Sequence, residues 1–172
     1  MAVFDKAFEY VLENEGVYSD HPLDRGGKTA YGITEIAANA HHCPQHQFGL
    51  KISDITRDLA RHIYFNDYWK FSDIKNEKVA IKLFDIAVNV GKVGMAYVLQ
   101  RALKACGENI KVDGIFGTKT EFAANKVPEF KLLNALSVQL ARYYVNIVQR
   151  DPKQIVFLEG WIVRAVRLPD SE

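Results

Sequence analysis

Apolar residues recur at helical spacing along almost the whole sequence, and this periodicity restricts the fold more than any other feature. The clearest case is a helix over about residues 3–15, whose apolar face is formed by Val3, Phe4, Ala7, Phe8, Val11 and Leu12. The same spacing predicts further helices over about residues 54–69, 77–91, 93–106, from 118 onward, 128–151 and 155–166. The sequence therefore predicts an all-α fold, in which residues 29–33 alternate as a short strand of a small β-hairpin.

The predicted helices have recognisable ends. Ser53 or Asp54 is expected to cap the second helix, Asn76 the third and Thr118 the short one. Gly91 is expected to end the third helix, because glycine readily adopts the left-handed conformation that follows a helix.

Length and charge limit the organisation and the partners. A chain of 172 residues suits one domain, or one compact body built from two small lobes. A boundary between lobes is expected at Gly91 and Gly94, which gives regions 1–91 and 92–168. A net charge of +1 favours neither nucleic acid nor a membrane surface. Acidic residues are concentrated early: residues 1–50 hold seven, against three lysines and arginines.

The compartment is predicted from cysteines and apolar runs. Cys43 and Cys106 are too few for a disulfide framework, which favours a reducing compartment. Acids interrupt every apolar run near the N-terminus, and no stretch reaches the length of a signal peptide or membrane span. We therefore expect synthesis in the cytoplasm without a signal peptide, and another export route for any target outside.

Two glutamates near the end of the first helix are not equivalent. Glu15 follows Val11 by four residues and lies on the apolar face, whereas Glu13 follows Glu9 by four on the solvated face. A carboxyl at an apolar edge loses hydration and tends to keep its proton, as a general acid must. The alternative is that Glu15 turns into solvent as a frayed helix end.

Further carboxyls follow on a glycine-rich turn. Asp20 and Asp24 lie five and nine residues after Glu15, so either can fold back toward it. Two carboxyls in unlike environments are the arrangement that glycoside hydrolysis uses, although acids are also common in ordinary turns.

The residues of this stretch carry a family resemblance. EGVY (residues 15–18) and DRGGKTAYGIT (residues 24–34) resemble the EGGY…DxGGxTxxGIT signature of glycoside hydrolase family 108, the N-acetylmuramidases that include phage endolysins and secretion activator proteins. The Glu…Asp…Thr spacing also resembles phage-type lysozymes more loosely. Later segments resemble the peptidoglycan-binding-like C-terminal region of the same family: YW (68–69), FDIAVNVG (84–91), LQRAL (99–103), VDGIFGTKT (112–120) and FLEGWIVR (157–164).

The resemblance implies a lysozyme-like helical body that hydrolyses the β-1,4 bond between N-acetylmuramic acid and N-acetylglucosamine in peptidoglycan. It makes Glu15 the catalytic acid, and makes Asp24 and Thr29 candidates for placing water or stabilising the charged sugar. As in phage lysozymes, inversion is expected. Val17 stands where the family has a second glycine, which is expected to alter the packing of the turn without removing activity.

The resemblance also implies partners. Peptidoglycan glycan strands are the expected substrate, a holin-like membrane partner would permit release, and the protein would act on the cell wall in the periplasm. It implies no cofactor, and a monomer is expected.

Sugar binding calls for aromatic rings and amides. Tyr18 lies within the family motif, and the other candidates are Tyr31, Tyr68, Trp69, Asn89 and Tyr144. The alternative for each is core packing, above all for Trp69. Asn89 and Asp85 are polar residues on an otherwise apolar helix face, so each needs a partner.

Two other classes of function remain open. Residues His41 to His46 contain zinc-type ligands, which would suit a metal-dependent amidase, but no second ligand cluster completes a site, so no metal is predicted. The second class is a non-catalytic peptidoglycan-binding or secretion-assisting module, which would not need the intact Glu15, Asp24 and Thr29.

Overall fold

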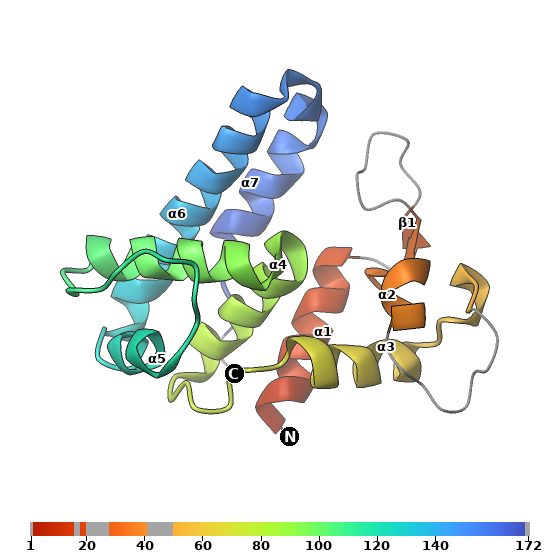
Figure 1. The fold of residues 1–172 in the computed structure, drawn as a ribbon, viewed down its shortest axis with the longest axis horizontal. Coiled ribbons are helices and arrows are strands. Elements are labelled where there is room, and N and C mark those ends of the chain that lie inside the picture. The colour runs from red at the N-terminus through yellow and green to blue at the C-terminus, as the bar shows by residue number, and fades with distance from the viewer. Residues whose placement is uncertain (1, 16–17, 20–27, 41–49, 171–172) are drawn as a thin grey trace. The chain divides into compact units, whose positions relative to one another are not determined.

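The computed structural model describes residues 2–15, 18–19, 28–40 and 50–170, with the backbone alone at residues 15, 18 and 19. The chain divides into two compact units, Met1–Trp69 and Lys70–Glu172. Both are built mainly of helices, and one small antiparallel sheet lies in the first unit (Figure 1). The predicted all-α class with a small hairpin is therefore confirmed.

The first unit consists of short elements around one longer helix. In chain order these are α1 (Ala2–Glu15), β1 (Tyr18–Ser19), β2 (Thr29–Ala30), β3 (Ile33–Thr34), α2 (Glu35–Ala40), the 3₁₀ turn η1 (Ile52–Asp54), α3 (Arg57–Ile63) and the π-helical turn η2 (Tyr64–Tyr68).

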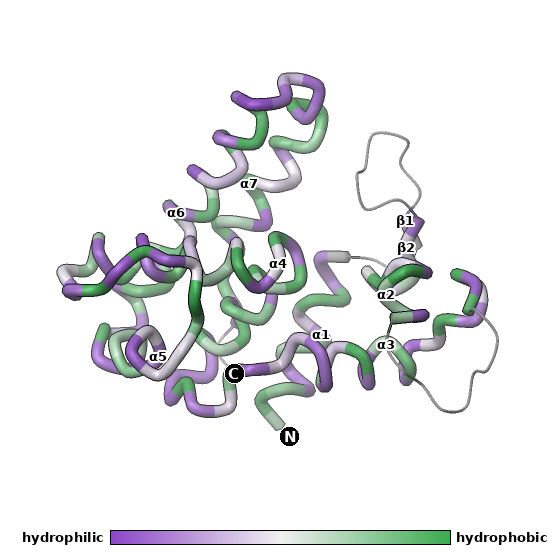
Figure 2. The backbone as a smooth tube through the Cα atoms, viewed as in Figure 1, coloured by the Kyte–Doolittle hydropathy of each residue, from purple (hydrophilic) through white to green (hydrophobic). Residues whose placement is uncertain are grey.

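Helix α1 buries the face that its sequence predicts. Phe4, Ala7, Phe8 and Val11 are all fully buried, and apolar and polar stretches alternate along the helix (Figure 2). Its polar face is joined to α3, because Arg57 pairs with Glu9, and Arg61 pairs with Asp5. The first helix therefore packs by its apolar side and is held by exposed ion pairs on the other.

The sheet has the order β1-β2-β3 with antiparallel neighbours. Strands β2 and β3 are joined by Tyr31 and Gly32, whose φ angles are 52° and 74°. Positive φ at both central residues is characteristic of a two-residue hairpin turn whose twist matches that of the strands. Glycine adopts this conformation freely, whereas Tyr31 needs support from its surroundings.

The expected cap of the second helix is wrong. Ser53 and Asp54 lie in η1, and the N-cap of α3 is Thr56, whose hydroxyl accepts a hydrogen bond from the Leu59 N–H at 3.2 Å. The helix begins later than predicted because the chain first makes a separate 3₁₀ turn.

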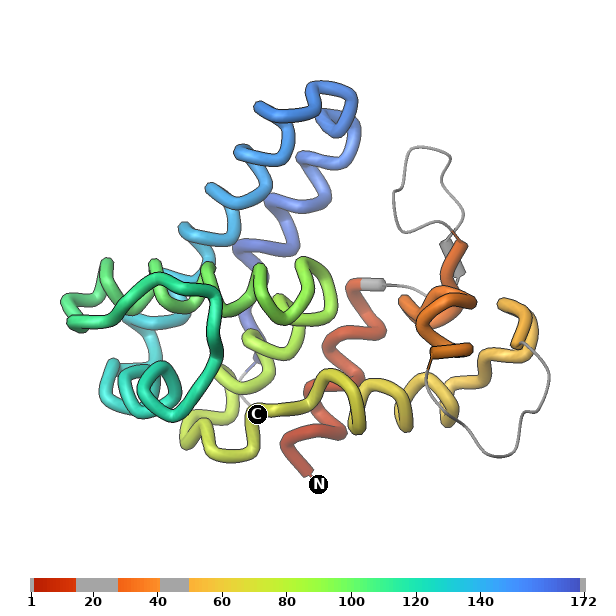
Figure 3. The backbone as a smooth tube through the Cα atoms, in the orientation of Figure 1, coloured from red at the N-terminus to blue at the C-terminus, as the bar shows by residue number. Residues whose placement is uncertain are grey.

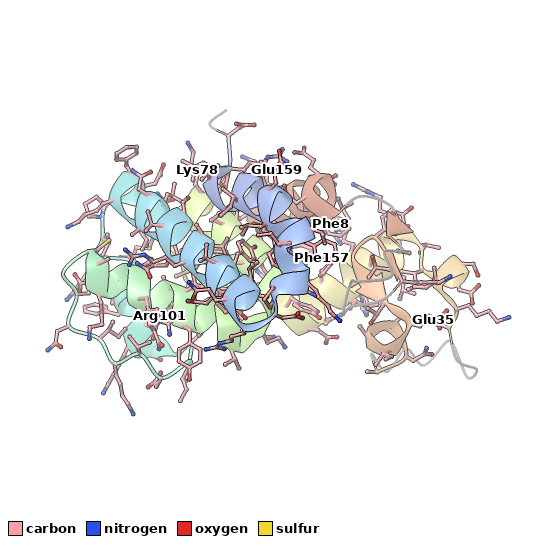
Figure 4. All side chains as sticks on the ribbon, turned by 90° about the horizontal axis from the view of Figure 1, so that it is seen from above. Phe8, Glu35, Lys78, Arg101, Phe157 and Glu159 are labelled. Carbon is pink, nitrogen blue, oxygen red and sulfur yellow. The ribbon has the colours of Figure 1, made fainter. Side chains whose placement is uncertain are left out.

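The second unit is formed by longer helices. They are α4 (Glu77–Ala105), α5 (Thr118–Ala124), α6 (Glu129–Arg150), the 3₁₀ turn η3 (Pro152–Phe157) and α7 (Leu158–Val166). Helix α6 packs against both α4 and α7. Helices α6 and α7 lie side by side, and Phe157 ends the turn η3 that connects them (Figure 4).

Helix α4 is interrupted where a glycine was expected to end it. Asn76 caps its start by accepting a hydrogen bond from the Val79 N–H at 3.1 Å, as predicted. Gly91 has φ 77° and ψ 162°, which are not helical, and the backbone changes direction along this element (Figure 3). The segments before and after Gly91 are thus two helices that meet at a kink.

Two other predicted ends in this unit are corrected. Gly117, not Thr118, is the N-cap of α5, and Thr118 is its first residue. The last predicted helix, 155–166, is α7 alone from Leu158 onward, because η3 occupies the residues up to Phe157. The proline at position 152 begins η3 and fits the predicted end of α6 before it.

A buried ion cluster joins α7 to α4. Arg164 donates to Asp85 Oδ1 from Nε at 3.0 Å and from Nη2 at 2.8 Å. The Lys82 ammonium lies 3.6 Å from Asp85 Oδ2 and donates to the carbonyls of Arg164 and Arg167 at 2.7 and 2.8 Å. Asp85, a charged residue on an apolar helix face, therefore has Arg164 as its partner, 79 residues later in the sequence.

Candidate active site

The end of α1 carries the predicted acid. Glu15 is the last residue of α1 and follows the fully buried Val11 by four residues. Glu13 is exposed, as its spacing from Glu9 predicts. The Glu15 side chain lies outside the description, so its assignment to the apolar face still rests on helical spacing.

The sheet connects the end of α1 with Thr29. In the β1–β2 pairing Ser19 lies opposite Thr29, and in the β2–β3 pairing Thr29 lies opposite Thr34. Ser19 follows Glu15 by four positions, so the two Cα atoms lie at most about 14 Å apart. The backbone therefore brings Thr29 into the neighbourhood of the helix end. Asp20 and Asp24 lie outside the described residues, as does Val17.

Tyr18 and Tyr31 belong to the same small sheet. Tyr18 lies opposite Ala30 in the β1–β2 register, and Tyr31 occupies the turn that follows. The Tyr31 side chain is half-buried. Four of the predicted site residues, namely Glu15, Tyr18, Thr29 and Tyr31, are thus carried by one local structure.

The turn at Tyr31 is held by Tyr64, which is not among the predicted site residues. Tyr64 is 0% exposed, and its hydroxyl donates a hydrogen bond to the Tyr31 carbonyl at 2.9 Å. Its ring contacts Phe8 of α1 edge-on at 5.9 Å. Tyr64 therefore links α1, the π-helical turn η2 and the hairpin that carries Thr29. The only signal in the sequence is that a buried tyrosine hydroxyl needs a partner.

Tyr68 and Trp69 make core contacts in this unit. Trp69 is 8% exposed and packs edge-on against Phe4, with ring centroids 5.5 Å apart. Tyr68 contacts Tyr64 at 5.6 Å, and burial, together with the charge of Asp67, raises its phenol pKa. Their predicted contact with a sugar stays a prediction.

Asn89 and Tyr144 lie in the second unit and contact each other. The Tyr144 hydroxyl donates to Asn89 Oδ1 at 2.6 Å, which supplies the partner that Asn89 was expected to need. Tyr144 is 1% exposed and stacks on Trp161, with centroids 5.1 Å apart. Their predicted role in substrate binding also stays a prediction.

The described residues contain neither a metal site nor a membrane span. His41 to His46 fall outside the described residues. Within the described ranges, no three side chains of His, Cys, Asp or Glu gather as a metal site would require. No helix among the described residues combines the length and the hydropathy of a membrane span.

Two parts of the sequence match models of known protein families. Residues 8–91 match the family model described as Glycosyl hydrolase 108, a range that contains the end of α1, the hairpin and η2. This region belongs to glycosyl hydrolase family 108. In the same chain, residues 95–166 match a second model, described as Predicted Peptidoglycan domain. Membership supports a lysozyme-like peptidoglycan hydrolase at the level of the family.

A solved structure shares the fold of this chain. It is described as the structure of Brucella abortus SagA and aligns over 99% of this chain and 98% of its own, with a TM-score of 0.70 and 23% sequence identity. The likeness therefore extends through both units. No curated protein matches the sequence.

Proposed function

We propose that this chain is an N-acetylmuramidase, which hydrolyses the β-1,4 bond between N-acetylmuramic acid and N-acetylglucosamine in peptidoglycan. The observation that carries the proposal is the family-108 match over residues 8–91, because this range holds Glu15 at the end of a helix with Thr29 on the adjacent sheet. Thr29 is paired with the strand that leaves that helix end.

Each candidate has a distinct role in the proposed reaction. Glu15 protonates the oxygen that leaves, and Asp24 or Thr29 places a water on the opposite face of the sugar, so that the configuration inverts. A separation of about 5 Å between the two carboxyl groups would instead favour retention through a covalent intermediate. The first product of inversion is the α-anomer, which proton NMR distinguishes before the anomers equilibrate.

We also propose that the two regions of the chain have different functions. Residues 1–91 form the catalytic region and residues 92–168 bind peptidoglycan, in keeping with the two family matches. Tyr18, Tyr31, Tyr68 and Trp69 would contact sugar in the first region. Asn89, near the end of the first region, would contribute an amide, and Tyr144 of the second region would contribute a ring. Release to the cell wall would use a membrane partner such as a holin.

The second candidate function is a peptidoglycan-binding or secretion-assisting module without catalysis. The match of residues 95–166 to a peptidoglycan domain favours it, because wall binding alone would satisfy that half of the chain. The two candidates differ in one property, namely whether new reducing ends appear when the protein meets its polymer.

The experiment compares the wild-type protein with Glu15→Gln on purified peptidoglycan and measures new reducing ends. Loss of the signal in Glu15→Gln supports the muramidase. Glu13→Gln is the matched control, because this neighbouring carboxyl is exposed and should be nearly silent. Equal activity of wild type and Glu15→Gln, or no activity in either, refutes the proposal. Loss of activity when a chelator is added would instead favour a metal site at the histidines of residues 41–46.

A further inference from the structure

The loop between α4 and α5 is fastened by one buried amide. Gln100 of α4 is 1% exposed, and its Oε1 accepts hydrogen bonds from the N–H groups of Asp113 and Gly114, both at 2.9 Å. Its Nε2 donates to Asp113 Oδ1 at 2.8 Å and to the Ile115 carbonyl at 3.0 Å. A single side chain thus fixes three consecutive residues of the loop.

Further contacts make this loop a preformed structure. Asp113 Oδ1 also accepts from the Ile115 N–H at 3.0 Å, and the Thr120 hydroxyl donates to the Ile115 carbonyl at 3.2 Å. Gly114 has φ 76°, and a Cβ there would lie 2.7 Å from Tyr97 Cε2. A loop that is already ordered loses little conformational entropy when it binds a ligand.

A cavity of about 400 Å³ lies against this loop. Its apolar lining includes Ile110 and Ile115, and Ile115 is 66% exposed although it is large and apolar. Lys111 and Lys119 line it as well, and both are exposed. Asp113 is the acidic residue of the lining, and its carboxylate already receives hydrogen bonds from Gln100 and from the Ile115 N–H.

The charges of the cavity favour an anionic ligand. Two lysines and one carboxylate line the cavity, so positive charge is in excess. The hydrogen bonds from Gln100 and then from Ile115 hold the pKa of Asp113 below its usual range, so this carboxylate stays ionised, and these two donors already occupy its Oδ1. Glycan strands offer hydroxyls and amides without charge in their backbone, whereas the stem peptides of peptidoglycan carry free carboxylates beside alanine methyl groups. The lysines complement the carboxylates, and the isoleucines complement the methyl groups.

We propose that the cavity bounded by Ile110, Lys111, Ile115 and Lys119 binds the acidic stem peptide of peptidoglycan. The inference rests on the proposed function, since the cell-wall polymer is the substrate in both. It gives the second unit a ligand that is chemically different from the sugars cleaved by the first. The binding unit would accordingly prefer glycan strands that still carry their peptides.

The test measures binding of the soluble tripeptide L-alanyl-γ-D-glutamyl-meso-diaminopimelate to the full chain by calorimetry. A tripeptide with its carboxylates amidated is the matched ligand. The variants are Lys111→Glu with Lys119→Glu, and separately Ile115→Ser, and the control is Lys104→Glu with Lys153→Glu, which reverses two exposed lysines outside the cavity. Melting temperatures verify that each variant is folded.

The wild type and the control should bind the acidic tripeptide equally, and the Lys111/Lys119 variant should bind about tenfold more weakly, as expected when two partly screened attractions become repulsions. Ile115→Ser should weaken binding without changing its dependence on salt, because it removes apolar contact alone. Equal affinity of wild type and the Lys111/Lys119 variant overturns the inference. Binding of the amidated tripeptide or of peptide-free glycan in preference to the acidic peptide overturns it as well.

Release of reducing ends by the wild type, measured in parallel, separates the two proposals. If no ends appear while the tripeptide binds through the lysines, the muramidase fails and the peptide site stands. If ends appear and depend on Glu15 while the tripeptide does not bind, the peptide site fails and the muramidase stands.

Discussion

Raising the pH from about 7.5 to about 9.5 is expected to stabilise the second unit through Lys82. This side chain is fully buried on α4, where it donates to the carbonyls of Arg164 and Arg167 at 2.7 and 2.8 Å. Burial disfavours the ammonium and lowers its pKa from the ordinary 10.5 to about 8, although Asp85 acts in the opposite direction.

The sign and size follow from proton binding. Between the folded pKa of about 8 and the unfolded pKa of 10.5, the unfolded chain keeps the lysine proton that the folded chain has released. The free energy of unfolding therefore rises with pH across this interval. For these two pKa values the gain between about pH 7.5 and about pH 9.5 is about 2 kcal/mol.

Urea denaturation of the wild type and of Lys82→Met at both pH values measures this gain. Burial also raises the pKa of Cys106 and of Tyr68, which lowers stability as the pH rises, but both groups are present in the two proteins and cancel in the comparison. The wild type should gain about 2 kcal/mol relative to Lys82→Met. The same pH dependence in both proteins would refute the assignment of a buried, desolvated ammonium to Lys82.

Other substitutions test single contacts. Tyr64→Phe should lower the free energy of unfolding by about 1 kcal/mol, because the hydrogen bond to the Tyr31 carbonyl is lost. It should also slow peptidoglycan hydrolysis, because this hydrogen bond holds the hairpin that carries Thr29. Unchanged stability and rate would contradict this role of Tyr64. Gly114→Ala should destabilise the chain by more than about 1 kcal/mol, because Gly114 has a positive φ and a Cβ there would collide with Tyr97. Gly160→Ala is the control and should be neutral or stabilising, because Gly160 is helical and nothing lies within 4 Å of the new Cβ. Asn76→Ala should cost about 1 kcal/mol by removing the cap of α4, and Asn76→Ser should restore most of this stability. Thermal denaturation measures the stability of all five variants.

Features that depend on neighbouring residues could be predicted from the sequence. The buried face of α1 follows from the spacing of Phe4, Phe8 and Val11, because one helical turn determines which side chains share a face. The cap at Asn76 and the break at Gly91 follow from the backbone preferences of those residues alone. The caps at Thr56 and Gly117 were missed, because several polar residues compete nearby and tertiary packing decides where the helix begins.

Features that join distant parts of the chain could not be predicted in this way. The hydrogen bond from Tyr64 to Tyr31 spans 33 residues, and the pair of Arg164 and Asp85 spans 79. Periodicity showed that Asp85 and Asn89 need partners, but it carries no information on which residue arrives opposite them. The family resemblance indicated both Glu15 and Thr29 as site residues, but it did not show how they come together. The strand register does, because it places Ser19 beside Thr29.

The sugar at the new reducing end distinguishes an N-acetylmuramidase from an enzyme that cuts the other glycosidic bond of peptidoglycan. Purified peptidoglycan is digested with wild type or Glu15→Gln, the products are reduced with borohydride, and the sugar alcohols are identified by mass spectrometry after acid hydrolysis. We expect the wild type to yield the alcohol of muramic acid and Glu15→Gln to yield none above background. The alcohol of glucosamine as the product, or equal yields from the two proteins, would contradict the proposed N-acetylmuramidase activity.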